Sequence, residues 1–374
     1  MIRAAALPGL CAAAMLISAS APAAAPMPSA NPDPSEAVPF RTGLHLADIQ
    51  IHDPWILADQ ATHTYYLYTS ASAAATGQHR GGTFVYRSQD LRSWQGPDTV
   101  FVCPDGSWAD PPQRAWAPEV HRYHGRYYLF TTLHNPDRPI ARSNLATPQP
   151  LFMRSTIIAV SDAPAGPFRM LKPGAPVTPA DFMTLDGTLY VDRAGKPWMV
   201  YAHEWVQKGD GTMEAIPLRD DLSDAAGDPI HLFKASDAPW IDSRMAPDAR
   251  LNDYVTDGPE LFRTRTGTLL MLWSSYERMP DHFESYVQTV ARSKSGELSG
   301  PWEQLPPLVR NDSGHGMLFH SFEGQLMLVV LQPFQDARSK IYEVEDLGDH
   351  LRVLRFRDDL SGPPLGPQKG RARN

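Results

Sequence analysis

The chain has 374 residues, of which 42% are hydrophobic and 10% aromatic, so it can bury a substantial core and is not a disordered chain. Its 36 prolines and 26 glycines favour many short strands joined by turns over long helices. The formal net charge of −8 argues against nucleic acid or an anionic membrane surface as a partner.

The first 25 residues have the composition of a secretory signal. Arg3 provides a positive charge, residues 4–17 form an apolar stretch, and Ala23-Ala24-Ala25 resembles a cleavage site. The apolar stretch is too short for a convincing membrane span. We therefore expect a secreted or periplasmic protein.

The rest of the chain divides by composition. Residues 26–45 form a Pro- and Ala-rich lead-in, residues 46–360 the folded domain, and residues 361–374 a flexible basic tail. Removal of the signal would leave Cys103 as the only cysteine, so no internal disulfide is expected. The domain must therefore be stabilised by its core.

A pattern of strand, turn and strand recurs five times along the domain. Each pair is followed by a third strand, and the units begin roughly 60–70 residues apart, too far for short propeller repeats. This period predicts an all-β fold, a five-bladed β-propeller, with a pair of β-sandwiches as the alternative. The paired strands are expected at residues 51–57 and 65–68, 116–120 and 127–130, 185–190 and 198–201, 257–262 and 269–273, and 314–319 and 326–331.

The first strand of each propeller blade lines the central axis, so the residues that open these strands should meet at one mouth of the channel. Like charges repel in a poorly solvated funnel, and we therefore expect such a cluster to have a function. The chemistry-bearing residues at these openings are Asp53, Glu119, Asp186, Asp257, Glu260 and His315.

Five motifs at the openings carry a resemblance to a known family. They are H-D-P-W-I-L from His52, W-A-P-E-V from Trp116, L-D-G-T-L-Y-V-D from Leu185, D-G-P-E-L from Asp257 and G-H-G-M from Gly314. With these motifs in this order, the chain resembles glycoside hydrolase family 43. The resemblance implies a five-bladed propeller that hydrolyses arabinose- and xylose-containing polysaccharides with inversion and requires no cofactor.

The resemblance also implies roles for three acids. Asp53 matches the general base, and Asp186 matches the acid that tunes the pKa of the proton donor. At the donor's position the family has Glu-Gly-Pro, whereas this chain has Asp257-Gly258-Pro259, with Glu260 close behind. Either Asp257 or Glu260 is then the proton donor, and position favours Asp257.

Several further residues are predicted to bind substrate. Aromatic rings pack well on the flat C–H faces of sugars, although most aromatic residues of a propeller pack between blades. In some relatives a histidine lies near a central metal ion, which leaves a structural calcium near His315 open, but a lone histidine does not itself predict a metal. The predicted substrate-binding residues are Trp55, Trp116, Glu119, Trp205 and His315.

These expectations combine into a secreted, monomeric glycosidase that releases arabinofuranosyl or xylosyl units from plant cell-wall oligo- or polysaccharides. An endo-arabinanase, or a galactan- or algal-polysaccharide-active glycosidase, is the alternative on the same fold. A carbohydrate-binding propeller that has lost catalysis is the alternative from another class. It is motivated by Asp257, which stands where the family has Glu.

Overall fold

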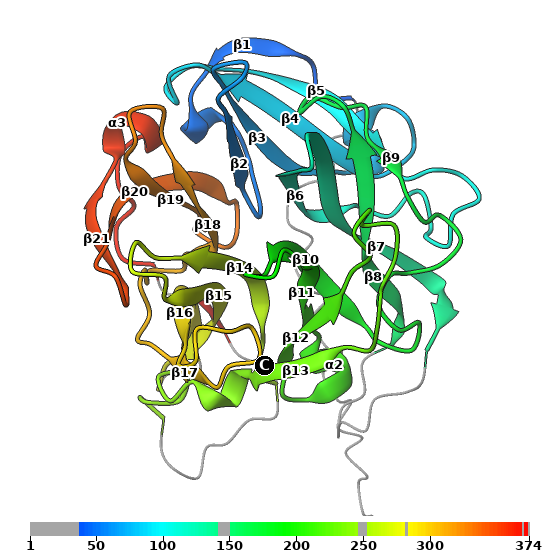
Figure 1. Cartoon of the computed structure of the whole chain (residues 1–374). Coiled ribbons are helices and arrows are strands. Elements are labelled where there is room, and N and C mark those ends of the chain that lie inside the picture. The colour runs from blue at the N-terminus through cyan, green and yellow to red at the C-terminus, as the bar shows by residue number, and fades with distance from the viewer. Residues whose placement is uncertain (1–36, 141–149, 246–252, 281–282, 369, 373–374) are drawn as a thin grey trace, which may run out of the picture.

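The computed structural model describes residues 37–140, 150–245, 253–280, 283–368 and 370–372. Five antiparallel sheets surround a central axis, which confirms the predicted five-bladed β-propeller (Figure 1). The predicted signal, residues 1–25, lies outside the described residues and stays a prediction. None of the helices in the described ranges has the length and apolar character needed to cross a membrane.

The blades follow one another along the chain, and each runs from an inner strand at the axis to an outer strand. Blade 1 contains β2 (Trp55–Asp59), β3 (Thr64–Ala71), β4 (Gly82–Ser88), β5 (Trp94–Val102) and β1 (Arg41–Leu44). Blade 2 contains β6 (Trp116–Tyr123), β7 (Arg126–Pro139), β8 (Phe152–Ser161) and β9 (Arg169–Met170). Blade 3 contains β10 (Thr184–Val191), β11 (Pro197–His203), β12 (Thr212–Pro217) and β13 (Ile230–Lys234).

The last two blades have the same plan. Blade 4 contains β14 (Asp257–Arg263), β15 (Leu269–Arg278), β16 (Phe283–Ser293) and β17 (Trp302–Gln304), and β22 (Arg371–Ala372) also pairs with β16. Blade 5 contains β18 (Gly314–His320), β19 (Leu326–Gln332), β20 (Arg338–Asp346) and β21 (Leu351–Phe356). The described helical segments are short: α1 (Ala73–Thr76), α2 (Trp205–Lys208), α3 (Asp358–Ser361), η1 (Leu46–Asp48) and η2 (Ala235–Asp237).

The middle strands are nearly continuous apolar segments because both of their faces pack against neighbouring blades. Every residue of β15 and of β19 is buried. Neighbouring inner strands contact each other around the axis, from β2 through β6, β10, β14 and β18 and back to β2. This closed ring brings together residues that are far apart in the sequence.

Two strands lie outside the predicted folded domain of residues 46–360. β1 falls within the expected lead-in, where it pairs with β5 and buries Leu44. β22 falls within the expected tail, where the Arg371 guanidinium lies 4.0 Å from the Tyr276 ring centre. Both strands are held by pairing with a blade, and strands this short have no periodicity that a sequence could display.

The inner strands share one backbone irregularity near their beginnings. In four of the five, the pairing register with the second strand shifts at this point, as in a β-bulge. Each inner strand, or the residues just before it, also has one residue with positive φ at the equivalent motif position. These residues are Asp53 (53°), Ala117 (46°), Asp186 (54°), Gly258 (49°) and His315 (45°).

Candidate active site

The residues with positive φ form the upper level of the site, together with Asp257. Left-handed backbone is unfavourable for residues other than glycine, and it persists where the surrounding structure enforces it, often at functional sites. Asp53, Asp186 and His315 all have this conformation. The fold therefore holds three side chains with acid–base chemistry in a strained arrangement around one axis.

Asp53 is a carboxylate held between two histidines. Its Oδ1 atom lies 3.2 Å from Nδ1 of His52 and 3.2 Å from Nδ1 of His315. Burial alone would raise the pKa of Asp53, but the His315 and His52 rings outweigh it and lower the pKa to about 2. Asp53 is therefore ionised at neutral pH, the state in which a carboxylate can accept a proton.

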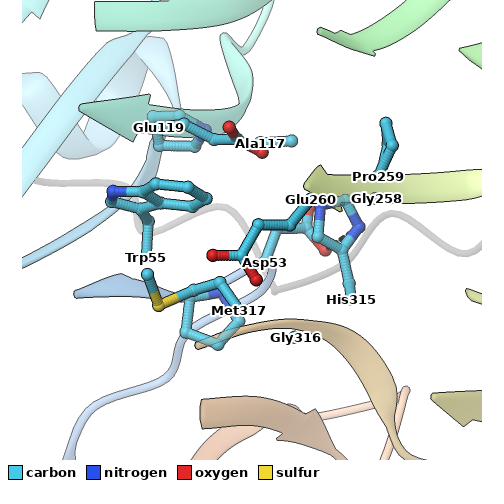
Figure 2. Close-up of a pocket in the computed structure, with 12 residues that line it drawn as sticks. Asp53, Trp55, Ala117, Glu119, Gly258, Pro259, Glu260, His315, Gly316 and Met317 are labelled. Carbon is cyan, nitrogen blue, oxygen red and sulfur yellow. Dashed lines mark ion pairs between the residues drawn. The ribbon is translucent and has the colours of Figure 1, made fainter. Parts of the chain in front are cut away.

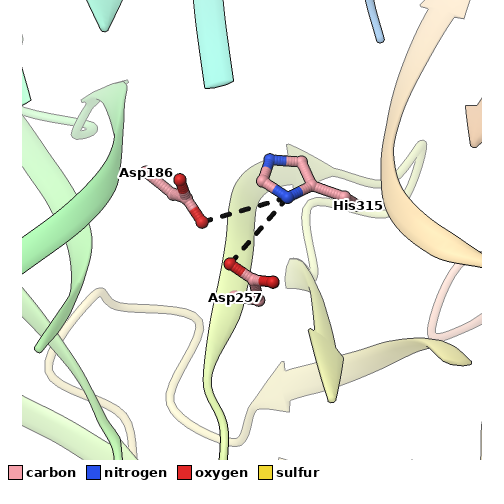
Figure 3. Close-up of side chains that lie close together, drawn as sticks. All are labelled: Asp186, Asp257 and His315. Carbon is pink, nitrogen blue, oxygen red and sulfur yellow. Dashed lines mark ion pairs between the residues drawn. The ribbon is translucent and has the colours of Figure 1, made fainter. Parts of the chain in front are cut away.

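Asp186 and Asp257 form a coupled pair of carboxyl groups (Figure 3). Burial, the charge of Asp257 and a hydrogen bond with Asp257 raise the pKa of Asp186 well above its ordinary value. The Gly258 amide donates to Asp186 Oδ2 at 3.1 Å, and the Tyr286 hydroxyl donates to Asp257 Oδ2 at 2.6 Å. Because two adjacent carboxylates cannot both ionise easily, Asp186 takes up a proton far more readily than an ordinary aspartate.

His315 lies between the three aspartates. Its Nδ1 atom is 3.2 Å from Asp53 Oδ1 and 3.9 Å from Asp257 Oδ1, so these two oxygens cannot be further apart than about 7 Å. Carboxyl groups that act as base and acid in inverting glycosidases stand roughly 6.5–9.5 Å apart, to leave room for a water molecule. The separation of these two oxygens therefore lies near the lower end of that range or below it.

Three side chains of this cluster could hold a metal ion by distance alone. Asp186, Asp257 and His315 each offer one ligand atom, and these atoms lie within 4.8 Å of one another. Calcium, however, takes six to eight oxygen ligands, whereas this set offers two carboxyl oxygens and an imidazole nitrogen. These three side chains do not by themselves make a calcium site, and a structural calcium near His315 stays a prediction.

A second group of side chains lies one level deeper in the channel. Trp55, Glu119, Glu260 and Met317 line the upper pocket together with Asp53 and His315 (Figure 2). Trp55, Glu260 and Met317 also line a second cavity of about 380 Å³, which none of the upper aspartates line. The side chains at the blade openings thus form two levels, whereas the sequence predicted a single cluster. Two levels arise because the residue with positive φ and the residue two positions later both face the axis.

The two glutamates of the deeper level, Glu119 (buried) and Glu260 (half-buried), both have raised pKa values. Burial raises the pKa of Glu119 to about 8, against the opposing effects of Thr188 and His315. Burial likewise raises the pKa of Glu260 well above its ordinary value, and its Oε2 atom accepts a hydrogen bond from the Leu318 amide at 2.8 Å. The Glu260 carboxyl group is therefore held by a backbone hydrogen bond, one level below the aspartates.

The three tryptophans predicted to bind substrate lie in different surroundings. Trp55 is buried, and its indole N–H donates to the Val120 carbonyl at 3.0 Å. Trp116 is half-buried beneath the Arg154 guanidinium, which lies 4.8 Å from its ring centre. Trp205 is half-buried at the start of α2. Their contact with substrate, like that of Glu119 and His315, stays a prediction.

Four polar residues near the aspartates were not singled out as site residues from the sequence. His52 and Tyr286 contact Asp53 and Asp257, while Glu204 forms an ion pair with Arg154. His52 is next to Asp53 in the first motif, so it could have been found there. No motif marks the other three, because Tyr286 and Arg154 lie within ordinary strands and Glu204 lies in the turn that follows β11.

Comparisons with known proteins bear on what this cluster does. The family model described as Glycosyl hydrolases family 43 matches residues 47–357. Among curated proteins, the chain is similar to the "Probable arabinan endo-1,5-alpha-L-arabinosidase B" of Aspergillus fumigatus (strain CBS 144.89 / FGSC A1163 / CEA10). The two are 24% identical over 298 residues, which covers 72% of this chain and 70% of that protein.

Solved structures include similar propellers. The endo-arabinase from Bacteroides thetaiotaomicron VPI-5482 is 35% identical, with a TM-score of 0.68, and the match covers 82% of this chain and 98% of that one. The endo-1,4-beta-xylanase from the same organism is 20% identical, with a TM-score of 0.63, and the match covers 84% of this chain and 97% of that one. At that identity the second match supports the fold alone.

Proposed function

The chain belongs to family 43 of the glycosyl hydrolases and is an inverting glycoside hydrolase, and from this premise we propose that it cleaves arabinofuranosyl linkages in arabinan. The observation that carries the chemistry is the cluster of three aspartates around His315. The substrate is supported by the similarity to an endo-arabinase at 35% identity and to a probable arabinan endo-1,5-alpha-L-arabinosidase. This proposal favours endo action over the release of single arabinofuranosyl or xylosyl units.

In the proposed reaction, Asp53 is the general base. Its low pKa keeps it ionised, so it can take a proton from the water that attacks the anomeric carbon. Burial and the neighbouring Asp257 raise the pKa of Asp186, and protonation of Asp186 would reduce the negative charge beside the reacting carbon. A carboxylic acid on the opposite side must protonate the leaving oxygen, and the product then has the inverted configuration.

Two further features belong to the proposal. Residues 1–25 support secretion or export to the periplasm, where polymeric substrate would be reached.

A second candidate function is the exo-acting release of arabinofuranosyl or xylosyl units. It is favoured by the half-buried aromatic side chains near the mouth, which suit a single sugar ring.

The test is a substrate panel of linear arabinan, xylan, galactan and aryl arabinofuranosides and xylosides, with products separated by chromatography. We expect arabinan to give short arabino-oligosaccharides, whereas single sugars as the first product would indicate exo action. NMR of the newly formed end should show the inverted anomer. Binding of arabinan by isothermal titration without any product would support the non-catalytic alternative and contradict the proposed function.

Asp53→Ala tests the assignment of Asp53 as the general base. We expect it to fold, because Asp53 opens a strand and its side chain is not part of the apolar core, but to lose at least about 10³-fold in kcat, since the attacking water loses its base. Asp162→Ala removes an exposed carboxylate that pairs with Arg126 and serves as the control with unchanged activity. Near wild-type hydrolysis by Asp53→Ala would show that the base has been assigned wrongly.

A further inference from the structure

We propose that Glu204 donates the proton to the leaving-group oxygen in the hydrolysis proposed above, on which this inference rests. Glu204 lies outside the five motifs, and the family's donor position is instead held by Asp257. Four observations support the assignment. They are the place of Glu204 in blade 3, its fixed backbone, its charged partner Arg154, and the contacts that already engage the carboxyl groups of Asp257 and Glu260.

Glu204 lies at the mouth end of blade 3. It directly follows β11, whose last residue, His203, pairs with Thr184 at the start of β10. Asp186 is two residues further along β10, so Glu204 leaves the blade beside the strand that carries Asp186. The negative charge of Asp257 contributes to the raised pKa of Glu204, which places the two carboxyl groups within electrostatic range of each other.

The backbone around Glu204 is held on both sides. The Glu204 amide donates to the Met183 carbonyl at 3.0 Å, and the Glu204 carbonyl accepts from the amides of Gln207 and Lys208 at 3.1 and 3.0 Å. The Gln207 side chain in turn donates to the Asp181 carbonyl and accepts from the Met183 amide. A carboxyl group on so constrained a turn has the fixed position that proton transfer requires.

Arg154 gives the Glu204 carboxyl group a partner for its ionised state. The Glu204 side chain is only 5% exposed, and its Oε1 atom accepts a hydrogen bond from Arg154 Nη1. Burial raises the pKa of Glu204, the ion pair with Arg154 opposes this, and Asp257 raises it further, so that the net shift is upward. Glu204 is therefore protonated more easily than an ordinary glutamate, and the Arg154 guanidinium lies where it stabilises the carboxylate that remains once the proton has been donated.

Arg154 is itself fixed in place. Its Nε atom donates to His134 Nδ1 at 2.9 Å, and its guanidinium lies 4.8 Å from the ring centres of Trp116 and Phe152. Trp116 is adjacent to Ala117, which lines the pocket that contains Asp53. The Arg154–Glu204 pair thus joins blades 2 and 3 close to the reacting site.

The other acids are less suited to donate the proton. Asp257 faces His315 with Oδ1 and accepts from Tyr286 with Oδ2, so both of its oxygens already have partners. It is also at most about 7 Å from Asp53, at the short end of the inverting range. Glu260 lies a level deeper and accepts from the Leu318 amide.

The step balances as follows. The O–H bond of Glu204 breaks as its proton forms a bond to the glycosidic oxygen, and the bond between that oxygen and the anomeric carbon breaks with its electron pair leaving on oxygen. Water bonds to the anomeric carbon from the opposite face and gives its proton to Asp53. Asp53 then releases a proton to solvent and Glu204 takes one up, which restores both groups.

The experiment compares Glu204→Gln, Asp257→Asn and Glu260→Gln on two substrates, arabino-oligosaccharides and 2,4-dinitrophenyl α-L-arabinofuranoside. The dinitrophenolate leaves without protonation, so loss of the donor should spare this substrate. We expect Glu204→Gln to lose about 10²- to 10⁴-fold in kcat/KM on the oligosaccharides and less than about tenfold on the aryl glycoside. Its pH profile should also lose the decline on the alkaline side.

A second variant separates donation from a structural role. Arg154→Met removes the positive charge that lowers the pKa of Glu204, so its alkaline decline in kcat/KM should move to higher pH. An equal loss of Glu204→Gln on both substrates, or leaving-group dependence in Asp257→Asn alone, would overturn the inference while leaving the proposed function intact. A wild-type enzyme inactive on every substrate would overturn both.

Discussion

Carboxyl groups in this site reach opposite protonation states through their immediate neighbours. Asp53 and Asp186 both occupy strained positions at the mouth, yet the pKa of Asp53 is lowered to about 2 and that of Asp186 is raised. Burial opposes ionisation of both. The difference arises because two histidines face Asp53, whereas a second carboxyl group faces Asp186.

Glu119 permits a test of this balance through stability. Its pKa is raised from 4.5 to about 8, so between these values the folded chain binds one more proton than the unfolded chain. Stability should therefore fall as pH rises from about 4.5 to about 8. Glu119→Gln, which cannot ionise, should flatten this slope and be more stable than the wild type by a few kcal/mol above pH 8.

The measurement is the free energy of unfolding in urea at several pH values. Glu297→Gln changes an exposed acid that pairs with Arg193 and should leave the slope of the wild type unchanged. An equal pH dependence in wild type and Glu119→Gln would show that Glu119 is not protonated in the folded protein.

At the scale of the element, the backbone irregularity near the start of the inner strands, with a bulge in four of the five, determines what reaches the axis. The same irregularity carries Asp53, Asp186 and His315 in three blades and Ala117 and Gly258 in the other two. An ordinary strand would alternate its side chains between two faces. The bulge changes that alternation, and thereby separates the aspartates from Glu119 and Glu260.

Gly258→Ala tests this element in blade 4. Its φ is +49°, and an added Cβ would lie 2.9 Å from ring carbons of His315. We expect destabilisation of about 1–3 kcal/mol and a loss of activity, since His315 must move away from the aspartates. Gly174→Ala is the control, because a Cβ there meets nothing within 4 Å.

Thermal unfolding and kcat report the two effects separately. If Gly258→Ala kept both the melting temperature and the activity of the wild type, the bulge would not hold His315 in place.

At the scale of the whole molecule, the propeller closes through contacts between its first and last blades. The Ile51 amide donates to the Ala337 carbonyl at 3.0 Å, and Arg338 Nε donates to the Ala47 carbonyl at 3.1 Å. These bonds join chain segments almost three hundred residues apart. Closure brings Asp53 of blade 1 against His315 of blade 5, so the integrity of the ring and of the site are coupled.

The end of the chain adds a further contact to blade 4. β22 pairs with Phe283 and Glu284 of β16, and Arg371 forms an ion pair with Glu284. Tyr286, which donates to Asp257, is two residues further along β16. Deletion of residues 362–374 should therefore lower the melting temperature by a few degrees.

Calorimetry of the truncated chain would measure this change. Deletion of residues 373–374 alone leaves β22 in place and should leave the melting temperature at the wild-type value. An unchanged melting temperature in the longer deletion would mean that β22 contributes nothing to the stability of blade 4.

The sequence by itself determined the fold and most of the aspartate cluster. The periodic strand pairs identify five blades, and the residues that open them include Asp53, Asp186, Asp257 and His315. This much is predictable because each blade repeats one local pattern, and a repeated pattern is readable without knowledge of distant contacts.

Only the tertiary structure decided which side chains share a level of the channel and which residues outside the motifs join them. A one-residue bulge moved Glu260 below Asp257, although the two are only three residues apart. Glu204 meets Arg154 from a different blade, fifty positions away. Such contacts depend on how blades pack around the axis, and that packing leaves no periodic trace in the sequence.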